Sequence, residues 1–232
     1  MKPETIENRW DILYRDYPEV YDEFASFPYK PDWVVFLGNM LKMDWSGKTV
    51  VDVGSGSGLS TFDLAAHAKF VVGVEPDDVM RELAIKNAGK RNIKNVEFVK
   101  GWAQEIPLKA NSVDDVLAFT APLEYRESTR IVKEGGFLIS IDVAPKWYGG
   151  ELAPIICGKK RVTEEDTEGK VHKKYSELNF KYKDFYQIQE YGSLEKIIKT
   201  YGFIFGKKAI DYLKKHNKTS IKWKWRIHYK KV

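Results

Sequence analysis

The sequence has 232 residues, of which 43% are hydrophobic and 14% aromatic, and its formal net charge is +5. This length and composition fit one globular domain with a substantial core, and the apolar runs WVVFLGNML and FVVGV are too short to span a bilayer. The opening MKPETIENRWD lacks the pattern of a signal peptide, and the single cysteine excludes an internal disulfide, so we expect a cytoplasmic protein without a membrane segment or a metal site.

The first 45 residues predict a helical cap. Ile6, Trp10 and Leu13 recur at helical spacing, and Pro18 ends that stripe. A short helix is expected over residues 20–26, and a strongly apolar one follows Asp32. This part is rich in aromatic residues. They either pack on the core or cover a pocket, and both interpretations remain open.

From Lys48 the pattern changes to alternating strands and helices. Buried strands are expected at TVVDVG, FVVGVEP, VEFVKG, DDVLAFT and GGFLISID. Helices are expected at SGLSTFDLAAHA and at DDVMRELAIKNAG, where Asp77 can cap the first turn. Strands that alternate with helices pair in parallel through right-handed crossovers, and near-continuous apolar strands are covered on both faces.

The chain after residue 144 has a different texture. Residues 158–177, GKKRVTEEDTEGKVHKKYSE, are charged and lack a convincing period, which predicts an exposed loop or insertion. DFYQIQEY predicts a strand, and the apolar residues after Ser193 predict one amphipathic helix that continues through Gly202 and Gly206. The closing TSIKWKWRIHYKKV alternates strictly, as in a half-buried antiparallel strand.

Lysines are concentrated in this last third of the chain. One interpretation is a basic surface for nucleic acid, because neutralising phosphates with Lys and Arg drives such binding. The other is a lysine-rich surface exposed to solvent, which we favour because arginine, the better reader of phosphates and bases, is not clustered there.

A glycine-rich loop, VVDVGSGSGLS, lies between the first core strand and its helix. Gly54, Gly56 and Gly58 allow backbone amides to approach a ligand at the N-terminus of a helix. Asp52 ends the strand before the loop, and Glu75 ends the next strand, where a carboxylate can accept both hydroxyls of a ribose.

Other nucleotide loops fit less well. The dinucleotide fingerprint G-x-G-x-x-G/A needs a small residue where Leu59 stands, which counts against an NAD-dependent oxidoreductase. No Lys-Ser/Thr pair follows the loop, which excludes a P-loop.

With these motifs in this order, residues 46–143 resemble the class I S-adenosylmethionine-dependent methyltransferases, particularly those with a type-11-like methyltransferase domain. The resemblance implies S-adenosylmethionine as the cofactor. It implies that Asp52 contacts the methionine ammonium and that Glu75 holds the ribose. The further positions that it places around the cofactor are Gly54, Ser55, Gly56, Gly58, Pro76, Trp102, Ala103, Phe119 and Tyr21. Trp102 departs from the acidic residue that is frequent at its position.

No catalytic residue is identified by the sequence. The Asn-Pro-Pro-Tyr/Phe tetrad of amide and adenine methyltransferases is absent after the fourth strand, where AFTAPLEY stands, and one cysteine cannot form a catalytic pair. The acceptor is expected over the carboxyl ends of the strands. Candidate acceptor residues are Tyr14, Tyr29, Glu124, Tyr125, Asp142 and Trp147.

The prediction is therefore an α/β protein with a Rossmann-like three-layer sandwich, a mostly parallel seven-stranded sheet, an antiparallel C-terminal strand and N-terminal helices. One methyltransferase domain over 1–232 is expected to comprise a cap (1–45), a cofactor-binding core (46–143), a loop or insertion (144–182) and a strand–helix–strand segment (183–232). The expected function is methyl transfer to a small molecule. The alternative is an RNA methyltransferase or an RNA-binding protein that uses the basic C-terminal third. The oligomeric state is left open.

Overall fold

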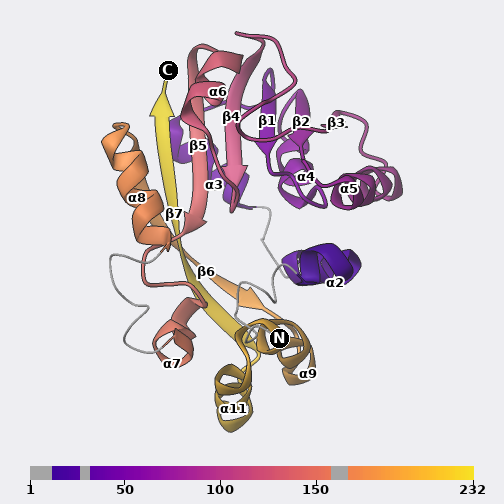
Figure 1. Ribbon diagram of the computed structural model, residues 1–232, viewed down its shortest axis with the longest axis vertical. Helices are drawn as coiled ribbons and strands as arrows, with labels where there is room; N and C mark the ends of the chain where they lie inside the picture. Colours follow the sequence, from indigo (N-terminus) through magenta and orange to yellow (C-terminus); the bar gives the residue numbers. More distant parts are fainter. Residues whose placement is uncertain (1–11, 27–31, 158–166) are drawn as a thin grey trace. The chain divides into compact units, whose positions relative to one another are not determined.

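A computed structural model describes residues 12–26, 32–157 and 167–232 (Figure 1). Its strands are β1 (Thr49–Val53), β2 (Phe70–Val74), β3 (Val96–Val99), β4 (Val113–Phe119), β5 (Val132–Val143), β6 (Lys181–Glu190) and β7 (Ser220–Lys231). Within the described residues they form one seven-stranded sheet in the order β3-β2-β1-β4-β5-β7-β6.

The sheet is parallel from β3 to β5 and antiparallel at β7. Val51 pairs with Val72 and with Val116, so β1 lies in parallel between β2 and β4. The ladder between β5 and β7 runs in the opposite sense, because Gly135 N–H donates to the Val232 carbonyl and Ala144 N–H to the Lys224 carbonyl. The predicted α/β fold with an antiparallel C-terminal strand is confirmed.

The helices flank these strands. They are α2 (Pro18–Ser26), α3 (Asp32–Leu41), α4 (Leu59–Ala65), α5 (Asp78–Lys90), α6 (Tyr125–Ile131), α7 (Ala153–Cys157), α8 (Thr167–Glu177), α9 (Leu194–Ile197), α10 (Phe203–Phe205) and α11 (Lys207–His216). The described residues also form a short 3₁₀ helix, η1 (Gly150–Leu152), and a π-helical segment, η3 (Ile198–Gly202). In Figure 1, α4 and α5 lie beside β1, β2 and β3. Asp77 caps α5 as predicted, because its carboxylate accepts the Met80 N–H at 3.0 Å.

The chain divides into two compact units whose segments interleave. Unit 1 comprises residues 1–29, 143–178 and 183–226, and unit 2 comprises 30–142, 179–182 and 227–232. Strands β6 and β7 therefore run through both units. The single domain and its internal boundaries that the sequence predicts stay a prediction.

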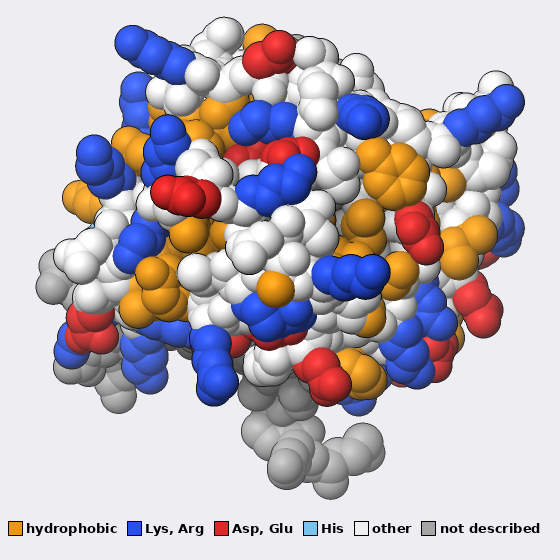
Figure 2. Space-filling view, turned by 90° about the horizontal axis from the view of Figure 1, so that it is seen from above, with side chains coloured by type: hydrophobic (Ala, Val, Ile, Leu, Met, Phe, Trp, Pro, Cys, Tyr) orange, Lys and Arg blue, Asp and Glu red, His pale blue; other side chains and the backbone are white. Residues whose placement is uncertain are grey.

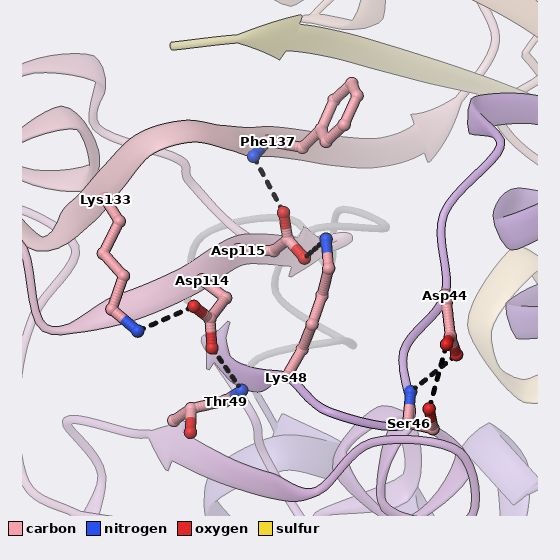
Figure 3. Close-up of polar contacts among 8 residues, drawn as sticks. All are labelled: Asp44, Ser46, Lys48, Thr49, Asp114, Asp115, Lys133 and Phe137. Carbon is pink, nitrogen blue, oxygen red and sulfur yellow. Dashed lines mark hydrogen bonds and ion pairs between the residues drawn. The ribbon is translucent and has the colours of Figure 1, made fainter.

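Unit 2 holds its strands in register with a polar network at the start of β1 and β4 (Figure 3). Asp115 is fully buried and accepts from the Lys48 ammonium at 2.7 Å and from the Phe137 N–H at 2.8 Å. Burial raises the pKa of Asp115 against these two donors. Asp114 likewise accepts from Lys133 at 2.7 Å and from the Thr49 N–H at 2.8 Å. These contacts fix the ends of the strands opposite the glycine loop.

Unit 1 has an aromatic core around β7. The Tyr201 ring is buried, and its centroid lies 4.4 Å from that of the Phe205 ring. The Tyr201 hydroxyl donates to the Gly149 carbonyl at 2.6 Å. Trp223 and Trp225 stack at 5.8 Å on the buried side of β7. The predicted alternation of β7 thus holds up to Ile227, but His228 on the expected polar side is also buried.

Two predictions about this unit are wrong. The amphipathic helix does not continue through Gly206, which separates α10 from α11. Its backbone angles, φ 78° and ψ −166°, can be adopted by glycine but are incompatible with an α-helix. The predicted loop over 158–177 contains helix α8 from Thr167 onward, and residues 158–166 lie outside the described residues. Helix α8 has only a narrow apolar stripe, which includes the buried ring of Tyr175. Its Lys and Glu residues are good helix formers and also stabilise it.

None of the helices in the described part of the chain is long and apolar enough to cross a bilayer. On the face that Figure 2 shows, Lys and Arg side chains are interspersed with Asp, Glu and hydrophobic side chains. The charge on that face is therefore mixed rather than uniformly basic.

Candidate cofactor-binding site

The glycine loop of unit 2 leads from β1 into α4 through three left-handed positions. Gly54, Gly56 and Gly58 have φ angles of 73°, 52° and 92°, which L-residues rarely adopt. A Cβ at Gly54 would overlap the Cβ of Ala121, and one at Gly58 would lie 2.6 Å from the Phe62 ring. The loop therefore requires glycine both for its backbone conformation and for its close packing.

Glu75 joins the loop to the start of α5. Its side chain is 2% exposed, and its two carboxylate oxygens accept from the Gly56 N–H at 2.8 Å and from the Asp77 N–H at 2.9 Å. The loop is also tied to β2, because the Gly54 N–H donates to the Val74 carbonyl at 2.8 Å. The carboxylate that the sequence assigns to ribose thus also orients the amides of the glycine loop.

Asp52 is fully buried at the end of β1, beneath the loop. Its Oδ2 accepts from the Ser60 and Thr61 hydroxyls, each at 2.7 Å, which holds the first turn of α4 against β1. Its Oδ1 has no hydrogen-bond partner among the described residues. Burial raises the pKa of Asp52 to about 6 against these hydroxyl donors, and the charge of Glu75 adds to the increase. A cationic group on Oδ1 would reverse this cost.

Ser55 supplies a second unsatisfied polar atom in the loop. Its side chain is 4% exposed, and its Oγ finds no hydrogen-bond partner within the described residues. Buried polar atoms are usually paired, so Ser55 Oγ and Asp52 Oδ1 mark a place where a polar ligand would complete the hydrogen bonding. The donors and acceptors present fit a ligand with an ammonium group and ribose hydroxyls.

The remaining predicted cofactor residues of unit 2 follow the carboxyl ends of strands. Phe119 ends β4, and its ring lies 5.4 Å from that of Trp33, whose indole N–H donates to Asp63 at 2.8 Å. Pro76 and Ala103 are half-buried. Trp102 is 50% exposed and forms a backbone bridge with Glu105. Half of the surface of Trp102 is therefore accessible, which leaves room for a contact with a ligand.

The candidate acceptor residues are divided between the units. In unit 2, Tyr125 lies 6.1 Å from the Phe180 ring and 4.7 Å from the Lys230 ammonium, and Glu124 precedes it at the N-cap of α6. Asp142 accepts from the Ser140 hydroxyl at 2.7 Å, and burial raises its pKa to about 6.

Unit 1 holds the other predicted aromatic residues. Tyr14 and Tyr21 pack edge to face at 5.1 Å, and Trp147 packs edge to face on Tyr186 at 5.6 Å. Tyr29 lies outside the described residues. The sequence grouped these residues with Tyr125 as one acceptor site, and that grouping stays a prediction.

Three residues that support the loop are not among those predicted from the sequence. Ala121 packs so closely against Gly54 that a Cβ at position 54 would overlap the Ala121 Cβ. The hydroxyls of Ser60 and Thr61 donate hydrogen bonds to Asp52. The two hydroxyl residues directly after Leu59 are a visible signal, because Ser and Thr at the start of a helix frequently bond to a neighbouring acceptor. Ala121 carries no such signal, since its role comes from the pairing of β1 with β4.

Comparisons with known proteins agree with this geometry. A family model described as a methyltransferase domain matches residues 50–136, which contain the glycine loop, Glu75, Trp102 and Phe119. A bifunctional glycosyltransferase/methyltransferase of Fusobacterium nucleatum is 32% identical over 126 residues, which are 51% of this chain and 19% of that protein. Residues 50–136 thus form a methyltransferase domain of the class I S-adenosylmethionine-dependent type.

Other relatives of the domain match over similar lengths. A methyltransferase of Bacillus subtilis, YcgJ, is 26% identical over 100 residues, 40% of each chain. A Dictyostelium discoideum protein is 38% identical over 95 residues, 38% of this chain and 34% of that one. The chain thus spans well under two thirds of the length of these curated relatives.

Solved structures share the fold of the methyltransferase domain. The crystal structure of YcgJ superposes with a TM-score of 0.54 at 18% identity, covering 83% of this chain and 95% of that one. A methyltransferase from Thiobacillus denitrificans, solved with S-adenosyl-L-homocysteine, gives a TM-score of 0.53 at 14% identity, covering 87% and 91%. At these identities the likeness concerns the fold.

Proposed function

We propose that this protein transfers a methyl group from S-adenosylmethionine to an acceptor, and that the acceptor is a small molecule. The observation that carries the proposal is the glycine loop with a buried carboxylate on either side, in a chain with a methyltransferase domain. When bound, S-adenosylmethionine supplies a methyl group activated on a sulfonium sulfur, so the protein mainly has to bind and orient.

In this proposal the residues of the chain act through position and charge. Glu75 accepts from the ribose hydroxyls while it holds Gly56, since each carboxylate oxygen can accept more than one hydrogen bond. Asp52 Oδ1 faces the ammonium of the cofactor's amino acid part, directly or through water. The rings of Trp102 and Phe119 enclose the adenine and methionine ends, with Pro76 and Ala103 beside them. Tyr21 belongs to unit 1, and its assignment to this site stays a prediction from the sequence.

A direct binding experiment tests the cofactor part. Isothermal titration calorimetry and thermal shift with S-adenosylmethionine and with S-adenosylhomocysteine should each show binding. If millimolar concentrations of both gave neither heat nor stabilisation, the methyl transfer proposal would be withdrawn.

A second candidate function is methylation or binding of RNA, which the lysines of the C-terminal third favour. Transfer of a labelled methyl group into lysate fractions separates the candidates. Label in the small-molecule fraction supports our proposal, and label in RNA supports the alternative. Asp142 and Tyr125 are the first positions to mutate once an acceptor is found, because a carboxyl with a raised pKa can take up a proton from a nucleophile.

A further inference from the structure

Unit 1 contains a pocket of about 890 Å³ between α8, the segment that follows β5, and β7. Its lining residues are Pro145, Lys146, Gly169, Lys170, His172, Lys173, Ser176 and Arg226. The volume lies within the range of small-molecule sites, about 300–1,000 Å³. All of the described residues that line the pocket belong to unit 1 and lie apart in sequence from the glycine loop.

The side chains of this pocket are predominantly cationic. Lys146, Lys170, Lys173 and Arg226 all line it. Asp184 accepts from Arg226 at 2.6 and 2.9 Å and from Lys224 at 2.8 Å, and a carboxylate oxygen of Glu177 lies 4.0 Å from the Lys173 ammonium. The described residues that line the pocket include these four cations and no acidic side chain.

The pKa of His172 is also affected by a neighbouring cation. Burial lowers the pKa of His172, the charge of Arg226 lowers it further, and Asp184 opposes the decrease. Lys146 has a φ of 71°, a conformation that non-glycine residues rarely adopt and that occurs disproportionately at ligand sites.

The same side of the β6–β7 ladder carries an exposed aromatic ring. Tyr186 is 56% exposed and follows Asp184 on one face of β6, the edge strand of the sheet. The ammonium groups of Lys222 and Lys224 lie 4.5 and 5.8 Å from the centroid of its ring. Ile188, next on that face, is 55% exposed. A flat apolar surface thus stands among cations at the edge of the sheet.

Shared contacts link the ring to the pocket. Trp147, which contacts Tyr186 at 5.6 Å, directly follows two pocket residues, Pro145 and Lys146. Lys224 reaches both Asp184 and the ring of Tyr186. We call this surface the basic face, and its residues are Lys146, Trp147, Lys170, Lys173, Tyr186, Lys222, Lys224 and Arg226.

We propose that the basic face binds a nucleotide unit, with the phosphate among the cations of the pocket and the base against Tyr186. Lys and Arg neutralise phosphate charge, and an aromatic ring stacks on any base because every base has a π face. A base that stacks on Tyr186 would displace Lys222 and Lys224 toward its own phosphate. The unit is either a free nucleotide or part of a single strand, and the inference does not rest on the methyl transfer proposed above.

Fluorescence anisotropy with a labelled single-stranded 12-mer RNA measures this binding. Unlabelled competitors are the same strand, its duplex, AMP, UMP and polyglutamate. Displacement by AMP or UMP as effectively per phosphate as by the strand assigns a free nucleotide, and displacement by the strand alone assigns single-stranded nucleic acid. Displacement by polyglutamate or duplex as effectively as by the strand would overturn the proposal, since neither offers an unstacked base.

Three variants separate stacking from charge. Tyr186→Ala should weaken binding about 5- to 150-fold, as for other base-stacking rings, and Tyr186→Phe should retain it. The double variant Lys170→Ala and Lys173→Ala should make the plot of log affinity against log salt shallower, decreasing the magnitude of its slope by about 1.4. The matched control, Lys214→Ala with Lys215→Ala, removes the same charge from exposed positions of α11 outside the basic face.

Two results would refute the assignment. One is no measurable binding of the strand, AMP or UMP at low salt. The other is equal weakening in the α11 control and in the Lys170/Lys173 variant, which would mean that total charge rather than the basic face binds the probe. Melting temperatures and binding of S-adenosylhomocysteine, measured on every variant, show whether each protein is folded, and they keep this test separate from that of the methyltransferase.

Discussion

In unit 2 the candidate cofactor site is formed mainly by backbone, whereas in unit 1 the basic face is formed by side chains. Three glycines with positive φ and the amides held by Glu75 define the first. The second brings together residues from the segment after β5, from α8, from β6 and from β7. The two regions therefore differ in how far their geometry tolerates a single substitution.

This difference has a physical basis. Glycine allows the positive φ angles of the loop, and hydrogen bonds from Gly54 to Val74 and from Gly56 to Glu75 hold that shape before any ligand arrives. Lysine side chains on a surface have many rotamers, and several of them share the task of neutralising a phosphate. We expect single changes to abolish function at the glycine loop and only to reduce it at the basic face.

The largest effect is expected for Gly54→Ala. The added Cβ would overlap Ala121 at a backbone φ of 73°, so the free energy of unfolding should fall by about 3 kcal/mol and cofactor binding should be lost. Denaturant unfolding and calorimetry measure the two quantities. The matched control is Gly89→Ala in α5, where nothing lies within 4 Å of the new Cβ and the helix should be stabilised by about 0.5–1 kcal/mol. Equal effects of the two substitutions would contradict a backbone-built site.

The contrast between the regions also explains what the sequence could predict. The succession of strands and helices along the core and the positions of Asp52, Glu75 and the glycines follow from apolar strands and a loop of five residues, which are local patterns. The pairing of Asp52 with Thr61 and the contact of Ala121 with Gly54 depend on the packing of α4 and on the β1–β4 pairing.

In the C-terminal third, local patterns were less informative. Helix α8 has only a narrow apolar stripe, so its charged sequence resembled a loop. The sequence shows that this part is rich in lysine, but it does not show which lysines lie close together in the fold. Lys170 and Arg226 meet at one pocket only because α8 and β7 border it together. Charge clustering of this kind is a property of the fold.

The second largest effect is expected for Glu75→Ala. It removes the acceptor of the Gly56 and Asp77 amides as well as the proposed ribose contact, so cofactor affinity should fall by about 1.5–3 kcal/mol. Glu75→Gln should have an intermediate effect, because one amide oxygen remains and the amide nitrogen faces a backbone donor. Titration calorimetry measures both. The control is Asp78→Ala, which removes an exposed carboxylate that pairs with Arg81 and Lys100. An affinity in Glu75→Ala equal to that of the control would place the ribose elsewhere.

A smaller effect is expected from pH. The pKa of Asp52 in the folded protein is about 6, above its ordinary value of 3.8, so ionising it costs stability as the pH rises from about 4 to 6. A cofactor ammonium favours the ionised form. Affinity should therefore increase about tenfold from pH 5 to pH 7, with release of a proton on binding below pH 6.

Calorimetry in buffers of different ionisation enthalpy measures that proton. Asp52→Asn should bind more weakly and lose the dependence on pH, whereas Asp142→Asn should keep it, although burial raises the pKa of Asp142 to about 6 as well. If Asp142→Asn abolished the dependence instead, the ammonium would have to be assigned to the end of β5 rather than to the end of β1.

The smallest effect is expected for Trp102, the one predicted cofactor residue of unit 2 whose ring is half exposed. Trp102→Ala should weaken cofactor binding by about 1 kcal/mol if the ring covers the adenine, and Trp102→Phe should restore most of that loss. The backbone bridge to Glu105 does not involve the ring, so both variants should melt at nearly the wild-type temperature. Trp102 is thus where the backbone-built site would depend on a side chain. Affinity unchanged in Trp102→Ala would mean that the glycine loop and the two carboxylates hold the cofactor without it.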